Sequence, residues 1–163
     1  MSYEYLRFFR GERSTRKDNL SINYLIQEAS DDQLEDGHNY IQWVFPNERL
    51  SGIRPKAVYA PITKEELQAI RNDRVAMENV WRMTTRMLHF WGIQYTREGP
   101  IVLNAEAFGN SVALEGDHNQ LRMTRMLSFF RSMGSTVIVD KMKAFLEANV
   151  RPRQEAHQFW ESV

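Results

Sequence analysis

The chain contains no cysteine among its 163 residues. Disulfides, thiolate nucleophiles and cysteine-based metal sites are therefore excluded, and the redox compartment is not revealed by cysteine usage. No apolar run approaches the roughly 18 residues that a helix needs to cross a bilayer. The first residues also lack the pattern of a signal peptide. From these absences we expect a soluble, cytoplasmic protein without a membrane span.

The chain also lacks an excess of charge of either sign. It has 21 basic and 21 acidic residues and a formal net charge of zero, so whole-molecule attraction to nucleic acid or to a membrane surface is excluded. No serine lies in a nucleophile elbow, no glycine-rich run fits a phosphate loop, and no pair of histidines has metal-ligand spacing. We therefore expect no cofactor and no metal site.

Apolar residues, by contrast, are plentiful. Hydrophobic residues make up 42% of the chain and aromatic residues 12%, which argues against disorder. A chain of this length suits one domain that buries most of its apolar surface. No internal repeat, low-complexity tract or linker interrupts it, so we predict a single domain over residues 1–163.

Apolar residues recur at three- and four-residue intervals, which is typical of amphipathic helices. The strongest pattern begins after Asp73 and is predicted to end at Trp91, where Gly92 can adopt the left-handed conformation that closes a helix. Thr63 and Glu66 fit a capping box that opens the preceding helix. Further helices are predicted over residues 3–10, 20–29, 30–35, 117–133 and 136–149, and from residue 152 through Phe159 and Trp160.

Residues 93–116 do not show a helical pattern. They contain three glycines and a proline, and structureless connections of this length are uncommon in compact domains. The segment could form a lid or contain a short strand or helix; Ile101 to Leu103 is β-prone but has no evident partner strand. The predicted fold class is therefore all-α: one compact bundle of about six or seven helices with a long irregular loop at about 93–116.

Two runs combine hydrogen-bonding side chains with a dense apolar stripe. They are HNYIQWVFP at residues 38–46 and HNQLRMTRML at residues 118–127. With the helical hairpin from Ala60 to Phe90, they are similar to the conserved domain of the opioid growth factor receptor family. The resemblance extends from about Leu6 to about Leu146. It implies a single, mainly helical domain.

The animal members of that family are associated with binding the pentapeptide Met-enkephalin and with the nuclear envelope. They carry additional segments and C-terminal repeats that this chain does not contain. The resemblance carries over no catalytic residues, so candidate site residues must come from the two runs themselves.

The first run offers a candidate acid–base pair. If one regular helix passes through His38, then Asp31, Glu35, His38 and Gln42 form one polar stripe. A carboxylate beside an imidazole orients the ring and favours its protonated form. In the alternative interpretation, a neighbouring helix satisfies His38, which then only holds the run in place; Gly37 also argues against a continuous helix.

The second run offers a candidate anion site. His118, Arg122 and Arg125 share one helix face, and His118 lies in the first turn, where free backbone N–H groups favour anions. Asn119 adds a donor and an acceptor, and guanidinium groups grip carboxylate or phosphate in bidentate fashion. In the alternative interpretation, both arginines pair with surface acids.

The two runs together predict a binding domain. A peptide or small anionic ligand would lie in a cleft between them, walled by Trp43 and Trp91 and contacted by Gln42 and Asn119, although ordinary core packing also explains the tryptophans. The alternative is a small, cofactor-free biosynthetic enzyme. In it His38 and His118 would be the acid–base groups and the two arginines would hold a carboxylate or oxyanion.

Overall fold

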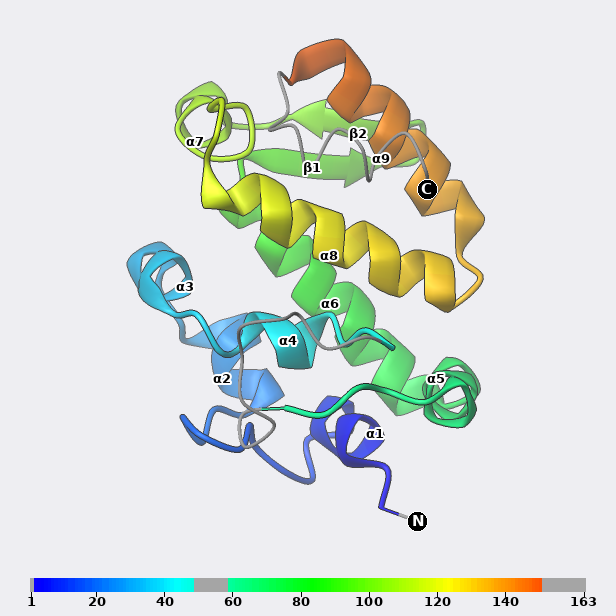
Figure 1. Cartoon of the computed structure of the whole chain (residues 1–163). Coiled ribbons are helices and arrows are strands. Elements are labelled where there is room, and N and C mark those ends of the chain that lie inside the picture. The colour runs from blue at the N-terminus through cyan, green and yellow to red at the C-terminus, as the bar shows by residue number, and fades with distance from the viewer. Residues whose placement is uncertain (1, 49–58, 151–163) are drawn as a thin grey trace. The chain divides into compact units, whose positions relative to one another are not determined.

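The structure is a computed structural model that describes residues 2–48 and 59–150. The chain forms two compact units, residues 1–84 and 85–163, and the boundary between them falls inside one long helix (Figure 1). The helix predicted from residue 152 lies outside the described residues.

The described residues contain nine helices and two strands. Unit 1 holds five helices and the first part of a sixth, which are α1 (Glu4–Phe9), α2 (Ile22–Gln27), α3 (Asp31–Asp36), α4 (Ile41–Val44), α5 (Lys64–Arg71) and α6 (Arg74–Phe90). Unit 2 holds the end of α6 and the following elements, which are β1 (Ile93–Thr96), β2 (Gly99–Val102), α7 (Ala105–Gly109), α8 (His118–Ser132) and α9 (Thr136–Asn149).

The all-α prediction is wrong, although the described chain is mainly helical. The segment expected to be irregular contains an antiparallel hairpin, in which Ile93 pairs with Val102 and Thr96 pairs with Gly99. Strands of four residues are too short for a reliable alternation of apolar and polar side chains. The prediction of six or seven helices is also too low, because α4 and α7 span less than two turns and show no helical period of their own.

Local signals placed the long helices correctly. Thr63 caps α5 by accepting a hydrogen bond from the Glu66 amide, as predicted. Gly92 lies two residues after the end of α6 and has a φ of +75°, which confirms it as the residue that closes the helix. α9 has the predicted bounds. These features depend on neighbouring residues alone, so the sequence suffices to identify them.

The capping box at Thr63 is only half formed, because the Glu66 carboxylate serves a different helix. One of its oxygens, Oε2, accepts hydrogen bonds from the Tyr5 amide at 2.8 Å and the Leu6 amide at 3.1 Å. These amides lie in the first turn of α1, whose own N-cap residue Tyr3 makes no side-chain cap bond. Glu66 therefore caps α1 from a helix about 60 residues away and joins α1 to α5.

Burial raises the pKa of Glu66 above its ordinary value of 4.5, an effect that the Leu6 and Tyr5 amides only partly offset. The folded protein therefore binds this proton more tightly than the unfolded chain does. It follows that the contribution of Glu66 to the free energy of unfolding falls as the pH rises from about 4.5 through the raised pKa.

We expect Glu66→Gln to gain stability relative to the parent protein over that pH range, because the amide keeps an acceptor oxygen and carries no charge to bury. Urea unfolding at a series of pH values measures this difference. Glu65→Gln, at an exposed neighbouring position, is the matched control and should show no such trend. Parallel pH profiles for Glu66→Gln and the parent protein would contradict the assignment.

Unit 2 is organised around α9. This helix packs against both α8 and strand β2 (Figure 1). Its Phe145 ring lies 5.6 Å from the Phe108 ring of α7, measured between centroids. In the part of the chain that the structure describes, no helix is both long and apolar enough to cross a membrane.

Candidate functional site

The first run does not lie on one regular helix. α3 ends at Asp36, and Gly37 has extended backbone angles (φ −71°, ψ 136°). His38 is an exposed residue of the connection to α4. The polar stripe that the sequence predicted through residues 31, 35, 38 and 42 is therefore broken, because glycine interrupts the helical repeat between its second and third members.

Gln42 and Trp43 both lie in the interior of unit 1. In the orientation that satisfies its neighbours, the Gln42 amide nitrogen donates to the carbonyl oxygens of His38 and Asn39 at 3.1 and 2.9 Å. Trp43 is fully buried. Its ring centroid lies 5.0 Å from that of Tyr5, and the Arg13 guanidinium lies 4.9 Å from it. These contacts hold the run in place, and its role in ligand binding stays a prediction.

The N-terminus of α8 is capped by an acid. The Asp117 side chain accepts a hydrogen bond from the Asn119 amide at 2.7 Å, so a carboxylate already lies against the first-turn amides that were predicted to attract an anion. His118 is half exposed, with Nδ1 3.8 Å from Asp117 Oδ1. The candidate anion-binding groups on α8 are therefore its side chains rather than its first-turn amides.

Asn119 brings two other predicted site residues together. Its side-chain oxygen Oδ1 accepts hydrogen bonds from Trp91 Nε1 at 3.0 Å and from Arg122 Nη1 at 3.3 Å. All three residues are buried in unit 2. The side-chain oxygen of Asn119 thus accepts the hydrogen bond that the N–H of a buried tryptophan needs. It also fixes the position of the Arg122 guanidinium group.

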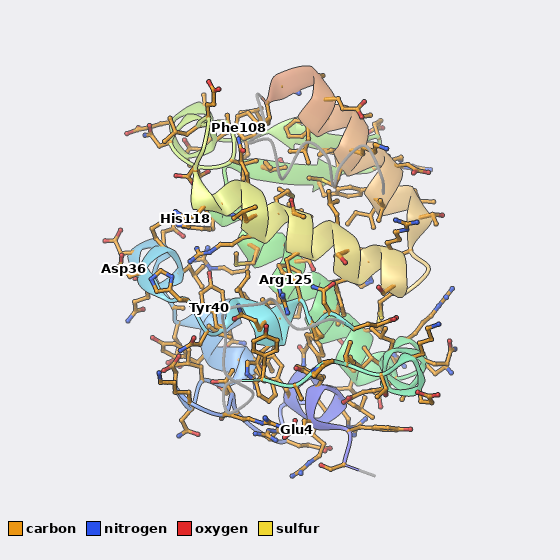
Figure 2. The ribbon with its side chains drawn as sticks, viewed as in Figure 1. Glu4, Asp36, Tyr40, Phe108, His118 and Arg125 are labelled. Atoms are coloured by element: carbon orange, nitrogen blue, oxygen red, sulfur yellow. The ribbon has the colours of Figure 1, made fainter. Side chains whose placement is uncertain are left out.

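Arg125 follows Arg122 by three residues and is half buried. Figure 2 shows His118 at the start of α8 and Arg125 further along the same helix. A spacing of three or four residues places side chains on one side of a helix. We call His118, Asn119, Arg122 and Arg125 the α8 polar face.

Gln120 also positions this face, although the sequence pattern did not identify it as a site residue. Gln120 is completely buried, and its Nε2 donates to the carbonyl oxygens of Val112 at 3.1 Å and Leu114 at 3.3 Å. These bonds fix the connection that leads into α8. The only feature of the sequence that could have indicated this role is the position of Gln120 between Asn119 and Leu121 in an otherwise amphipathic helix.

The two runs lie in different units, so the predicted cleft between them stays a prediction. Within the described residues, histidine and acidic side chains form no group of three or more that could hold a metal ion. The candidate site that can be built from described contacts is therefore the α8 polar face with Trp91.

Comparison with known proteins decides the family. Residues 1–157 match the model of the opioid growth factor receptor (OGFr) conserved region. The chain belongs to this family. It is 32% identical to the mouse opioid growth factor receptor and 31% identical to the human one, each over 134 residues. It is 29% identical over 136 residues to opioid growth factor receptor-like protein 1 of Xenopus tropicalis.

Each of these alignments covers 79% of this chain but only 21% of the mouse receptor, 19% of the human receptor and 25% of the Xenopus protein. The chain thus spans a quarter or less of the length of these relatives. No solved structure matches the chain. These relatives' names describe receptors and receptor-like proteins, so the enzyme alternative, with His38 and His118 as acid–base groups, gains no support from them.

Proposed function

We propose that this OGFr-family domain binds a peptide or a small anionic ligand, and that the α8 polar face holds the ligand's anionic group. The observation that carries the proposal is the pair of guanidinium groups one turn apart on α8, of which Arg122 is buried and positioned by Asn119. The names of the mouse and human relatives describe receptors for a growth factor, which favours a ligand-binding role over catalysis.

The chemistry of the face suits a carboxylate. A guanidinium group presents several N–H donors in a planar fork, and the two oxygens of a carboxylate match that fork. Burial lowers the local dielectric constant and strengthens such hydrogen bonds. The bond to Asn119 restricts the Arg122 side chain before the ligand arrives, which reduces the entropy that binding would otherwise cost.

A peptide is the ligand class that combines this anion with apolar groups. Its C-terminal carboxylate would contact Arg122 and Arg125. Its remaining side chains would lie against apolar residues nearby. A small carboxylic acid would use the same guanidinium groups with fewer apolar contacts and therefore bind more weakly.

We expect Arg122→Ala to weaken binding of such a peptide by about 10- to 100-fold, because a charge-assisted hydrogen bond contributes about 1.5–3 kcal/mol. The probe is Met-enkephalin, the pentapeptide associated with the animal members of the family, in its free-acid and C-terminally amidated forms. Isothermal titration calorimetry measures both affinities. Amidation should weaken binding to the parent protein and make little difference to Arg122→Ala.

Two variants separate ligand contact from folding. Arg131→Ala removes an exposed arginine near the end of α8 and should bind as the parent protein does. Arg122→Lys keeps the positive charge but loses the planar fork of N–H donors. Its affinity for the peptide should therefore lie between those of the parent protein and Arg122→Ala. Equal binding of both peptide forms by the parent protein and a folded Arg122→Ala variant would refute the role of the α8 polar face.

A further inference from the structure

Helices α6 and α8 carry a short repeated sequence. It reads NVWRMTTRML at residues 79–88 of α6 and NQLRMTRML at residues 119–127 of α8. Both runs contain Asn, Arg-Met-Thr and Arg-Met-Leu in the same order, with one additional threonine in the first run. This match corrects the expectation that the chain contains no internal repeat.

The same hydrogen bond follows the asparagine of each run. In α8, Asn119 Oδ1 accepts from Arg122 Nη1 at 3.3 Å. In α6, Asn79 Oδ1 accepts from Arg82 Nη1 at 3.1 Å. Both asparagines are buried. The two helices therefore hold an arginine in the same way, through a buried amide oxygen about one turn earlier.

The agreement extends to the residues that follow each arginine. Met83 and Met123 are both buried. The hydroxyl groups of Thr84 and Thr124 each donate to the carbonyl oxygen four residues earlier, at 2.7 and 3.0 Å. In α6, the orientation that buries the methionine leaves Arg82 half buried, at the edge of the buried side of the helix.

A second contact fixes the orientation of the Asn79 amide. Its Nδ2 donates to the Phe9 carbonyl oxygen at 2.7 Å, so Oδ1 is the atom that accepts from Arg82. Although Glu78 lies four residues earlier on α6, Arg82 forms no ion pair with any acidic residue that the structure describes. The guanidinium group is thus positioned by a neutral acceptor, and its positive charge is not compensated by a carboxylate.

An exposed apolar residue precedes the arginine in both runs. Trp81, before Arg82, and Leu121, before Arg122, each retain 41% of their accessible surface. Tryptophan and arginine are among the residue types enriched where binding energy is concentrated. The flat ring of an exposed tryptophan offers a large contact area to an aromatic group of a ligand.

We propose that Asn79, Trp81 and Arg82 form a second ligand-binding site, the α6 site, for a carboxylate that is attached to an aromatic group. Arg82 binds the two carboxylate oxygens through its planar fork of N–H donors, and the Trp81 ring contacts the aromatic group. Asn79 is a positioning residue that holds the guanidinium group. The α6 site relies on the same guanidinium chemistry as the proposed function but uses no residue of the α8 polar face.

NMR of the indole N–H groups tests the two sites separately in the full chain, because Trp81 belongs to one site and Trp91 to the other. The probe is N-acetylphenylalanine, a carboxylate with one aromatic ring, and its uncharged amide is the control compound. Titration with the acid should shift the Trp81 signal along a saturable curve. The amide should bind at least about 10-fold more weakly, because it lacks the charge-assisted hydrogen bonds.

Arg82→Ala should weaken the response of Trp81 to the acid by at least about 10-fold, while Trp91 responds as in the parent protein. Arg82→Lys keeps the charge without the fork and should give an intermediate affinity. Arg74→Ala, at the exposed first residue of α6, is the matched control and should leave the Trp81 curve unchanged. The indole signal of Trp43, which is buried in unit 1, shows that each variant is folded.

The outcomes distinguish this inference from the proposed function. A Trp81 signal that ignores the acid, or that responds equally to the acid and the amide, would overturn the α6 site whatever the Trp91 signal does. A Trp81 response that survives Arg82→Ala unchanged would overturn it as well. If Trp81 responds as expected and Trp91 does not, the α6 site is supported and only the α8 polar face is refuted.

Discussion

Gly92→Ala is expected to lower the free energy of unfolding by about 3 kcal/mol. Gly92 has a φ of +75°, and a residue with a Cβ loses roughly 1–2 kcal/mol in that conformation. The added Cβ would also press against the Asn104 carbonyl oxygen and lie 2.6 Å from the Phe108 amide nitrogen. Both are backbone atoms, so no side-chain rotation relieves the overlap, and overpacking of this kind costs about 1–3 kcal/mol.

This position joins three elements of unit 2. Gly92 ends α6, and its carbonyl oxygen accepts hydrogen bonds from Leu103 at 2.8 Å and Asn104 at 3.1 Å. Asn104 in turn caps α7 through the Ala107 amide. Displacing the backbone at Gly92 therefore disturbs the end of the hairpin and the start of α7 at once.

Gly109→Ala is the matched control. Gly109 lies in α7 with no atom within 4 Å of an added Cβ, so alanine there should be neutral or stabilising by up to about 1 kcal/mol. Chemical denaturation of both variants measures the difference in unfolding free energy. Similar effects for Gly92→Ala and Gly109→Ala would show that the close approach at Gly92 does not constrain the fold.

Asn119→Ala is expected to lower the free energy of unfolding by about 2–4 kcal/mol. The substitution removes the oxygen that accepts hydrogen bonds from the Trp91 indole and the Arg122 guanidinium. A buried donor that loses its acceptor costs about 1–3 kcal/mol. Asn110→Ala, at an exposed asparagine after α7, is the control and should change stability by no more than about 0.5 kcal/mol.

A double-mutant cycle isolates the bond to the indole. Trp91→Phe removes the N–H donor and keeps an aromatic ring, so it should cost less in the Asn119→Ala background than in the parent protein. A coupling free energy of about 1 kcal/mol is expected from urea unfolding of the four proteins. Strict additivity would show that this hydrogen bond does not contribute to stability.

Asn119→Ala also tests the binding proposal, because Asn119 positions Arg122. Peptide affinity should fall even at temperatures where the variant stays folded, since the Arg122 side chain then has more freedom to lose on binding. Unchanged affinity in a folded Asn119→Ala variant would mean that Arg122 needs no positioning for binding.

Sequence patterns located the helices wherever the signal was local. The Thr63 cap, the Gly92 terminator and the bounds of α9 all depend on residues within one turn of each other. The helix predicted over residues 20–29 begins instead at Ile22, after the N-cap Ser21, whose side chain accepts a hydrogen bond from the Tyr24 amide at 3.0 Å. Serine is one of several residue types that favour the N-cap position, so apolar spacing alone did not locate the start of this helix.

The candidate site was predicted in part. The residues of the α8 polar face follow from a helical spacing of three and four, and the structure brings Trp91, Asn119 and Arg122 together. The stripe through His38 was not formed, because one glycine with an extended backbone breaks the helix. The hydrogen-bond partners of buried side chains depend on contacts between elements. The spacing of residues along the sequence does not reveal these contacts.

The amino-acid sequence by itself determined the family, through the runs at residues 38–46 and 118–127, and the positions of the long helices. The tertiary structure alone decided that residues 93–102 form a hairpin and that Glu66 caps α1. It also decided that Asn119 joins Trp91 to Arg122. Each of these features depends on hydrogen bonds between groups on separate elements. Such bonds form only where packing brings those elements together.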